Sequence, residues 1–199
     1  MKNEKLDKLN KDLQDYVNEY YKEEIKLVFG SGASNARIVL VGEAPGKHEV
    51  LQGKPFVGQA GKNLDEFIDV LGISRDDIYI TNAVKLRPYK ISPETGRESN
   101  RTPTKTEIEF FSEHLKSELN ILKPEIVVSL GNIALRSILG SSSATIGVLH
   151  GNPLDVDYGE VRFKLFPLYH PASIIYRAEL KSVYLEDLHK LKEFLKLNP

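Results

Sequence analysis

In the stretch ARIVLVGEAPG, residues 36–46, a continuous apolar run is followed directly by a sharp turn. A short β-branched run without polar alternation is typical of a strand that is buried on both faces. In the turn, glycine lets backbone amides approach a ligand closely, and Pro45 restricts the chain. We therefore predict a buried strand over residues 36–42, followed by a loop that continues through GKPFVGQAG, residues 53–61.

Strands and helices alternate along the rest of the chain. Apolar runs predict further strands over residues 77–84, 124–131 and 161–171. Helical spacing of leucines predicts helices over residues 4–23, 60–72, 104–122 and 132–139, and a last one through Leu185–Leu195. Thr104 and Glu107 form the signature of a capping box. Residues 85–103 are predicted to be a long loop, and the alternation predicts a parallel sheet with helices on both faces.

Composition predicts one domain over residues 1–199, on which residues 1–24 pack as an N-terminal helix. The net charge is −1, so attraction to nucleic acid has to come from a local patch. The chain contains no cysteine, which excludes disulfides, thiolate catalysis and cysteine-held metal clusters. It shows no secretory signal and no apolar run of membrane-spanning length, so we expect a cytoplasmic, monomeric protein that makes no membrane contact.

Polar residues stand where the predicted strands end. Glu43, Asn82, the Gly131–Asn132 pair and His170 each follow an apolar run. Ligands of open parallel sheets bind beyond the carboxyl ends of the strands. The pattern therefore predicts that an acid, an amide and an imidazole meet at one edge of the sheet.

Each of these motifs also has a purely structural interpretation. GEAPG, residues 42–46, matches neither a Walker loop nor a dinucleotide fingerprint, and it alone is equally typical of a simple turn. Phe56 suits either a core position or a platform for a stacked ring. Asn82 suits a strand end or, through its adjacent donor and acceptor, the edge of a pyrimidine. A histidine before proline, such as His170, is often structural.

Taken together, these motifs resemble the uracil-DNA glycosylase superfamily. The resemblance rests on VGEAPGKHEVLQGKPFVGQAGKNLDEF, TNAVKLRP, NRTPTKTEIEFF, PEIVVSLGNIALRSILG and YHPASIIYR, in order over residues 25–180. It is most specific to the family 4 branch, which is related to segments described as phage SPO1 DNA polymerase-like. It implies a three-layer α/β/α sandwich with a central four-stranded parallel sheet.

The resemblance also implies residue roles in a monofunctional DNA glycosylase. Phe56 would stack on a flipped-out uracil, Asn82 would read its edge, and His170 would contact its O2 as charge builds there. Glu43 and Glu49 would position water and stabilise the transition state. Two further residues are expected to contact the base, Gly42 and Ala44. The residues expected to contact the DNA are Pro45, Gly46, Ser173, Ile174 and Arg177. The candidates for the wedge that fills the gap left by the extruded base are Ile174, Ile175 and Arg177.

Basic side chains gather in and beside residues 85–103. We expect phosphate contacts there, although a solvated loop is the alternative. The candidates are Lys85, Arg87, Lys90, Arg97, Arg101 and Lys105.

The sequence departs from the family in two ways, and from a related branch in one further way. Family 4 members typically carry four cysteines that hold an iron–sulfur cluster, whereas Leu86 and Phe111 occupy two of those positions here. We expect apolar packing, worth roughly 2 kcal/mol for each side chain, to replace the cluster. Val50 stands where a further acid is common. Residues 83–103 contain no histidine, which argues against the covalent uracil chemistry of a related branch.

These observations favour a uracil-DNA glycosylase that acts in base excision repair with neither metal nor other cofactor. One alternative is a non-catalytic DNA-binding sensor or polymerase-accessory module that keeps the base site but has no need of the carboxylates. Another is a nucleotide-processing enzyme whose glycine-rich loop binds a free phosphate. The absence of a phosphate-loop lysine pattern counts against it.

Overall fold

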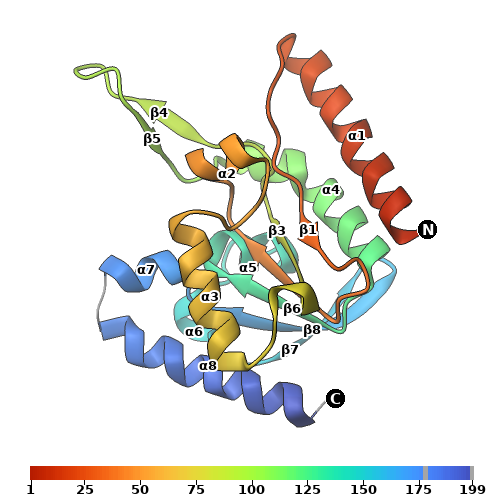
Figure 1. Cartoon of the computed structure of the whole chain (residues 1–199), viewed down its shortest axis with the longest axis vertical. Coiled ribbons are helices and arrows are strands. Elements are labelled where there is room, and N and C mark those ends of the chain that lie inside the picture. Colours follow the sequence, from red (N-terminus) through yellow and green to blue (C-terminus); the bar gives the residue numbers. More distant parts are fainter. Residues whose placement is uncertain (177–178, 198–199) are drawn as a thin grey trace.

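The computed structural model describes residues 1–176 and 179–197 (Figure 1). Its strands are β1 (Ser31–Gly32), β2 (Ile38–Gly42), β3 (Ile78–Asn82), β4 (Tyr89–Ile91), β5 (Glu98–Asn100), β6 (Ile126–Leu130), β7 (Leu154–Tyr158) and β8 (Val161–Leu168). Its helices are α1 (Lys2–Tyr21), α2 (Lys47–Gln52), α3 (Gln59–Leu71), α4 (Lys105–Leu122), α5 (Gly131–Leu139), α6 (Ile146–Leu149), α7 (Pro171–Tyr176) and α8 (Glu179–Leu197), with a 3₁₀ turn over Arg75–Asp77.

The four predicted strands form the parallel centre of the sheet, in the order β3-β2-β6-β8. The sheet is wider than predicted, because β1 pairs antiparallel with β3 at one edge and β7 pairs antiparallel with β8 at the other. β1 has only two residues and β7 is exposed at alternate positions, so neither carries a continuous apolar run. The chain leaves β2 toward β3 on one side and returns to β6 on the other, which places a topological switch point beside the end of β2.

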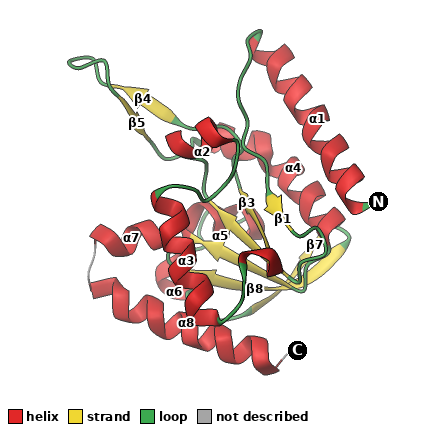
Figure 2. Cartoon of the chain, in the orientation of Figure 1, coloured by secondary structure: helices red, strands yellow, loops and turns green. Residues whose placement is uncertain are grey.

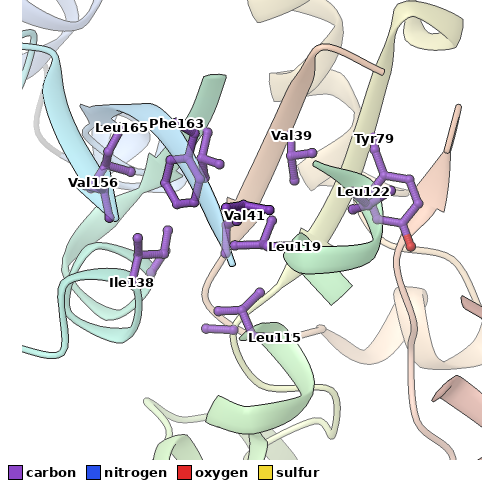
Figure 3. Close-up of a cluster of buried hydrophobic side chains, with 14 of the residues drawn as sticks. Val39, Val41, Tyr79, Leu115, Leu119, Leu122, Ile138, Val156, Phe163 and Leu165 are labelled. Carbon is purple, nitrogen blue, oxygen red and sulfur yellow. The ribbon is translucent and has the colours of Figure 1, made fainter. Parts of the chain in front are cut away.

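Helices cover both faces of this sheet, as predicted (Figure 2). One core layer lies between the sheet and helices α4 and α5; Figure 3 shows Val39 and Val41 of β2 beside Leu115 and Leu119 of α4. The other layer packs alternate strand residues such as Leu40 against α3 and α8. Successive strand side chains point to opposite faces, so the continuous apolar runs supply both layers at once.

Residues 85–103 differ from the predicted loop. Strands β4 and β5 pair antiparallel within it and form a hairpin that projects from the body of the molecule (Figure 1). Every residue of both strands is exposed, so the apolar pattern that marks a strand is absent. The predicted capping box at the start of α4 is confirmed, because the Glu107 N–H donates to Thr104 Oγ1 at 3.2 Å and Glu107 Oε2 accepts from the Thr104 N–H at 2.7 Å.

The N-terminal helix α1 packs along α4 (Figure 1). A third apolar cluster joins α1, the segment before β1, the chain after β3 and α4. Val17, Val84 and Phe111 are its fully buried members, and Leu86 packs against it half-buried. No helix in the described part of the chain is both long and apolar enough to cross a membrane.

Candidate active site

The site lies at the carboxyl edge of the sheet, where β2 and β3 end side by side. Gly42 pairs in register with Asn82, the last residues of these strands. The pairing continues beyond them, because the Ala83 N–H donates to the Gly42 carbonyl at 2.9 Å and the Val84 N–H to the Glu43 carbonyl at 3.0 Å. The parallel strands therefore place the backbone of Glu43 beside the residues that follow Asn82.

Gly42 is the point at which Phe56 and Asn82 meet. A Cβ atom placed on Gly42 would overlap Asn82 Oδ1 and would lie 2.8 Å from Cε2 of the Phe56 ring. Only a residue without a side chain leaves room for both groups. The predicted ring platform and the predicted base-reading amide thus lie against the same glycine.

His170 completes this cluster. Its ring centroid lies 6.5 Å from that of Phe56, with the planes inclined at 34°. Gly131 allows the approach, since a Cβ there would lie 3.2 Å from His170 Cβ and the backbone φ of 86° favours glycine. The structure therefore brings together Phe56, Asn82 and His170, the residues expected to contact one ring.

The side-chain amide of Asn82 has an unpaired hydrogen-bond donor within the described part of the chain. Its side chain is 2% exposed, and among the described residues Nδ2 has no hydrogen-bond partner. A buried amide hydrogen without an acceptor costs roughly 1–3 kcal/mol, and such sites in native proteins call for an explanation. An acceptor oxygen on a bound ligand would remove that cost.

His170 is held as a neutral hydrogen-bond donor. The Ala172 N–H donates to Nδ1 at 3.1 Å, so Nδ1 carries no proton and Nε2 carries the single one. Burial lowers the pKa of His170 to about 4, so the ring is uncharged at neutral pH. The ring can therefore donate one hydrogen bond, from Nε2, without bringing a positive charge.

Glu43 is a half-buried carboxylate, and its side chain has no hydrogen bond to the described residues. Burial raises the pKa of Glu43 above its ordinary value. A half-buried carboxylate whose oxygens accept no hydrogen bond from the described residues suits the binding of a water molecule.

Glu49 is placed differently from Glu43. Its oxygens accept the Gly46 N–H at 2.7 Å and the Phe56 N–H at 2.6 Å, and the side chain is 7% exposed. Burial raises the pKa of Glu49, while these two backbone bonds act in the opposite direction. The carboxylate ties the two ends of the loop together, and its expected part in catalysis stays a prediction.

Lys85 requires a correction. It was expected at a DNA phosphate, but its side chain is fully buried and forms an ion pair with Glu118 at 2.7 Å. The other basic candidates lie nearer the surface. Arg87 binds Glu98 and Asn100, and Arg101 binds Glu107. Lys90, Arg97 and Lys105 are exposed on or beside the hairpin.

The remaining candidates follow the expected loops. Gly42 and Pro45 are buried, while Ala44 and Gly46 are half-buried in the turn after β2. The Ser173 hydroxyl donates to the His170 carbonyl at 2.6 Å, so it helps to hold the turn into α7. The side chains of Ile174 and Ile175 and the whole of Arg177 lie outside the described part of the chain. Asn132 Oδ1 accepts the Ile146 N–H at 2.8 Å, so this side chain holds the start of α6.

Sequence reasoning missed two features beside the site. Glu118 and Tyr79 form a buried polar network with Lys85 on the other face of β3, and no local pattern marks a glutamate inside an amphipathic helix as buried. Asn100 of the hairpin brings its Nδ2 within 3.3 Å of a Cβ built on Gly46. The position of Asn100 in the motif NRTP, between a strand and a helix, is the sequence signal that could have marked it as a residue near the glycine-containing turn.

An iron–sulfur cluster does not fit the residues present. The chain supplies no thiolate, and Leu86 and Phe111, at two of the family's cysteine positions, pack in the third apolar cluster. Within the described residues, no group of three or more histidine, aspartate and glutamate side chains is placed to hold a metal ion.

The chain is similar in sequence to several known proteins. A type-4 uracil-DNA glycosylase of Archaeoglobus fulgidus is 37% identical over 176 residues, which are 87% of this chain and 84% of that one. Its counterpart in Thermotoga maritima is 38% identical over 85% of this chain and 83% of that one. A DNA polymerase of Bacillus phage SP01 is 29% identical over 83% of this chain but only 16% of its own length. Residues 29–192 match the model of one family, and the chain belongs to the uracil DNA glycosylase superfamily.

Proposed function

We propose that this protein is a uracil-DNA glycosylase, which hydrolyses the bond between uracil and deoxyribose and leaves the DNA strand intact. One observation carries the proposal: Phe56, Asn82 and His170, from three separate segments, converge at one edge of the sheet. The similarity to type-4 uracil-DNA glycosylases over more than four-fifths of the chain supports the same activity.

The three residues suit a pyrimidine ring. Phe56 offers an aromatic ring for stacking, and Asn82 Nδ2 offers a hydrogen to a carbonyl oxygen such as O4. His170 donates from Nε2 to the other carbonyl, O2. In the free chain Phe56 is 3% and Asn82 2% exposed, so a base reaches them only after the surrounding groups move.

The reaction breaks the bond between the sugar C1′ and the base N1. The electron pair of that bond goes to the base, which leaves as an anion whose charge is shared with O2. A neutral histidine that already points a hydrogen at O2 stabilises this charge as it forms, and one preorganised donor of this kind lowers a barrier by roughly 3 kcal/mol. Because the His170 pKa is about 4, the ring stabilises the leaving base by hydrogen bonding and not by proton transfer.

Glu43 acts on the sugar. As the bond breaks, C1′ becomes cationic, and a carboxylate beside it is stabilising. Water attacks C1′, its oxygen stays on the sugar, and its proton goes to Glu43 and from there to solvent. The uracil anion takes up a proton from solvent, so that the products are uracil and an abasic sugar. The raised pKa of Glu43 makes it a better base than an exposed glutamate.

The DNA has to present the base outside its stack. Extrusion from a duplex costs a few kcal/mol, and less in a single strand. The projecting hairpin, with Lys90 and Arg97 exposed on it, supplies phosphate contacts beside the glycine loop. We further propose that the protein acts as a monomer in the cytoplasm.

A non-catalytic sensor of uracil is the second candidate. Such a module needs the ring platform and the amide but has no use for a desolvated carboxylate. Glu43, half-buried and without a side-chain partner in the described chain, therefore favours the enzyme.

The test is cleavage of a labelled single-stranded oligonucleotide with one uracil, followed by alkali. Breaks at the uracil are expected with the natural chain and are expected to disappear in Asn82→Ala and His170→Ala. His48→Ala is the matched control, since His48 is exposed on α2. A thymine oligonucleotide controls for specificity. Tight binding without breaks would establish the sensor instead.

A further inference from the structure

A buried ion pair lies behind the base-reading strand, on the face opposite to the site. Lys85 and Glu118 are both fully buried, and Lys85 Nζ lies 2.7 Å from Glu118 Oε2. Every polar atom of the pair has a partner: Tyr79 donates to Glu118 Oε1 at 3.0 Å and Thr81 to Oε2 at 2.9 Å. No part of the chemistry proposed above uses this network.

The pair is joined directly to Asn82. Lys85 Nζ donates to the Asn82 backbone carbonyl at 2.8 Å and to Thr81 Oγ1 at 2.6 Å. Neighbouring side chains of a strand point to opposite faces, so Thr81 faces α4 while Asn82 faces Phe56. Lys85 therefore binds one group on each side of the Asn82 Cα, the Thr81 hydroxyl before it and the Asn82 carbonyl after it.

Stability alone does not call for charges here. A buried ion pair is often replaced by apolar residues of similar volume without loss of stability. An apolar pair would fill the same space but would supply no donor to the Asn82 carbonyl. Burial lowers the Lys85 pKa; it would also raise that of Glu118, but Lys85, with His114 and Thr81, holds the Glu118 pKa below its ordinary value.

We propose that Lys85 and Glu118 are positioning residues: the ion pair fixes the end of β3 so that the Asn82 amide stands at the place of the uracil edge. The inference rests on the proposed function, because it needs Asn82 to read the base. Through Glu118, the helix α4 becomes part of the base-recognition machinery without touching the base.

The test removes both charges together, in Lys85→Met/Glu118→Gln. Glutamine keeps the partners of Tyr79 and Thr81, and methionine fills the volume of the lysine stem, so the fold is expected to survive. The catalytic efficiency kcat/KM on single-stranded uracil DNA is expected to fall between about tenfold and a hundredfold, the effect of a displacement of about 1 Å in a catalytic group.

A double-mutant cycle separates positioning from a merely structural role. If the pair acts through Asn82, then Asn82→Ala costs much less activity in the charge-free variant than in the natural chain. The matched control is Arg37→Met/Glu125→Gln, which removes an ion pair of 2.7 Å at the amino-terminal ends of β2 and β6, away from the site. In that control background, the fold-losses of kcat/KM caused by the control substitutions and by Asn82→Ala are expected to be independent. Their product should therefore match the loss in the combined variant to within about twofold. Equal costs of Asn82→Ala in all backgrounds, or full activity of the charge-free variant, would overturn the proposal.

Two further measurements keep the test decisive. If the double variant does not fold, Glu118→Gln alone enters the same cycle. If the natural chain shows no cleavage, the proposed function fails, and positioning is then read from the Asn82 side-chain amide in nitrogen-15 spectra, assigned by its loss in Asn82→Ala. A shift of that signal in the charge-free variant but not in the control supports positioning, and an unchanged signal refutes it.

Discussion

The Phe56 N–H donates to Glu49 Oε1 at 2.6 Å, and this bond holds Phe56 at a φ of 52°. A residue with a side chain pays a penalty of about 1–2 kcal/mol in this left-handed region. The second oxygen of Glu49 accepts the Gly46 N–H. One carboxylate thus closes the loop that presents the ring.

We expect Glu49→Gln to lower the free energy of unfolding by about 1–3 kcal/mol, because the new amide group faces a backbone donor. Activity is expected to fall with it, while the pH at which activity is lost in acid stays the same, since Glu43 sets that pH. Thermal unfolding and a pH profile of kcat/KM measure the two effects, with His48→Gln as control. A displaced acid limb would show that Glu49 itself titrates in the reaction.

Gly42→Ala is expected to abolish most activity, because the added methyl group collides with both Asn82 and Phe56. A displacement of about 1 Å in either group corresponds to a loss of about a hundredfold. The matched control is Gly140→Ala, where a Cβ meets nothing within 4 Å and only the φ of 61° is unfavourable. Cleavage of the uracil oligonucleotide compares the two, and equal losses would contradict the contact.

The pH dependence of activity follows from two groups. His170, with a pKa of about 4, is neutral throughout the neutral range, and Glu43, whose pKa burial raises, protonates before His170 does as the pH falls. Activity is therefore expected to be lost in acid as Glu43 gains a proton, and Glu43→Gln to remove this limb along with most of the rate.

Nitrogen-15 spectra test the histidine separately. His170 is expected to show an unprotonated Nδ1 and a protonated Nε2 at neutral pH, with no change until the pH approaches its pKa of about 4. Titration near 6.5, the ordinary value, would contradict the buried neutral donor.

The Arg101–Glu107 pair predicts a pH-dependent stability. The hydrogen bond from Arg101 lowers the Glu107 pKa to about 2 from the ordinary 4.5. Because the folded value is the lower one, the stabilisation is present above pH 4.5 and is lost as the pH falls toward 2. Arg101 is one-third exposed, so solvent screening reduces the effect at pH 7 to about 1–2 kcal/mol. Denaturant unfolding of Arg101→Gln is expected to show a deficit that shrinks over this range.

A substitution of Phe111 tests whether apolar packing replaces the iron–sulfur cluster that is typical of family 4. Phe111→Ala is expected to cost about 3–5 kcal/mol of unfolding free energy, as for other fully buried phenylalanines. Its half-buried neighbour Phe110 stacks on Tyr16 at 5.7 Å, and Phe110→Ala is expected to cost clearly less. Equal costs would mean that the third apolar cluster does not hold α1 and α4 together.

The sequence by itself determined the parallel centre of the sheet, its covering helices and the positions of Asn82 and His170 at the carboxyl ends of their strands. Those predictions succeed because a strand buried on both faces has to be apolar throughout, which makes its polar end conspicuous at Asn82 and near His170. Only the tertiary structure decided that Lys85 lies inside the protein, that Glu49 ties down Phe56, and that an exposed hairpin replaces the predicted loop. Lys85 meets a glutamate 33 residues away, Glu49 bonds to the backbone of Phe56 across a loop, and the hairpin rests on backbone pairing. None of these leaves a periodic trace in the sequence.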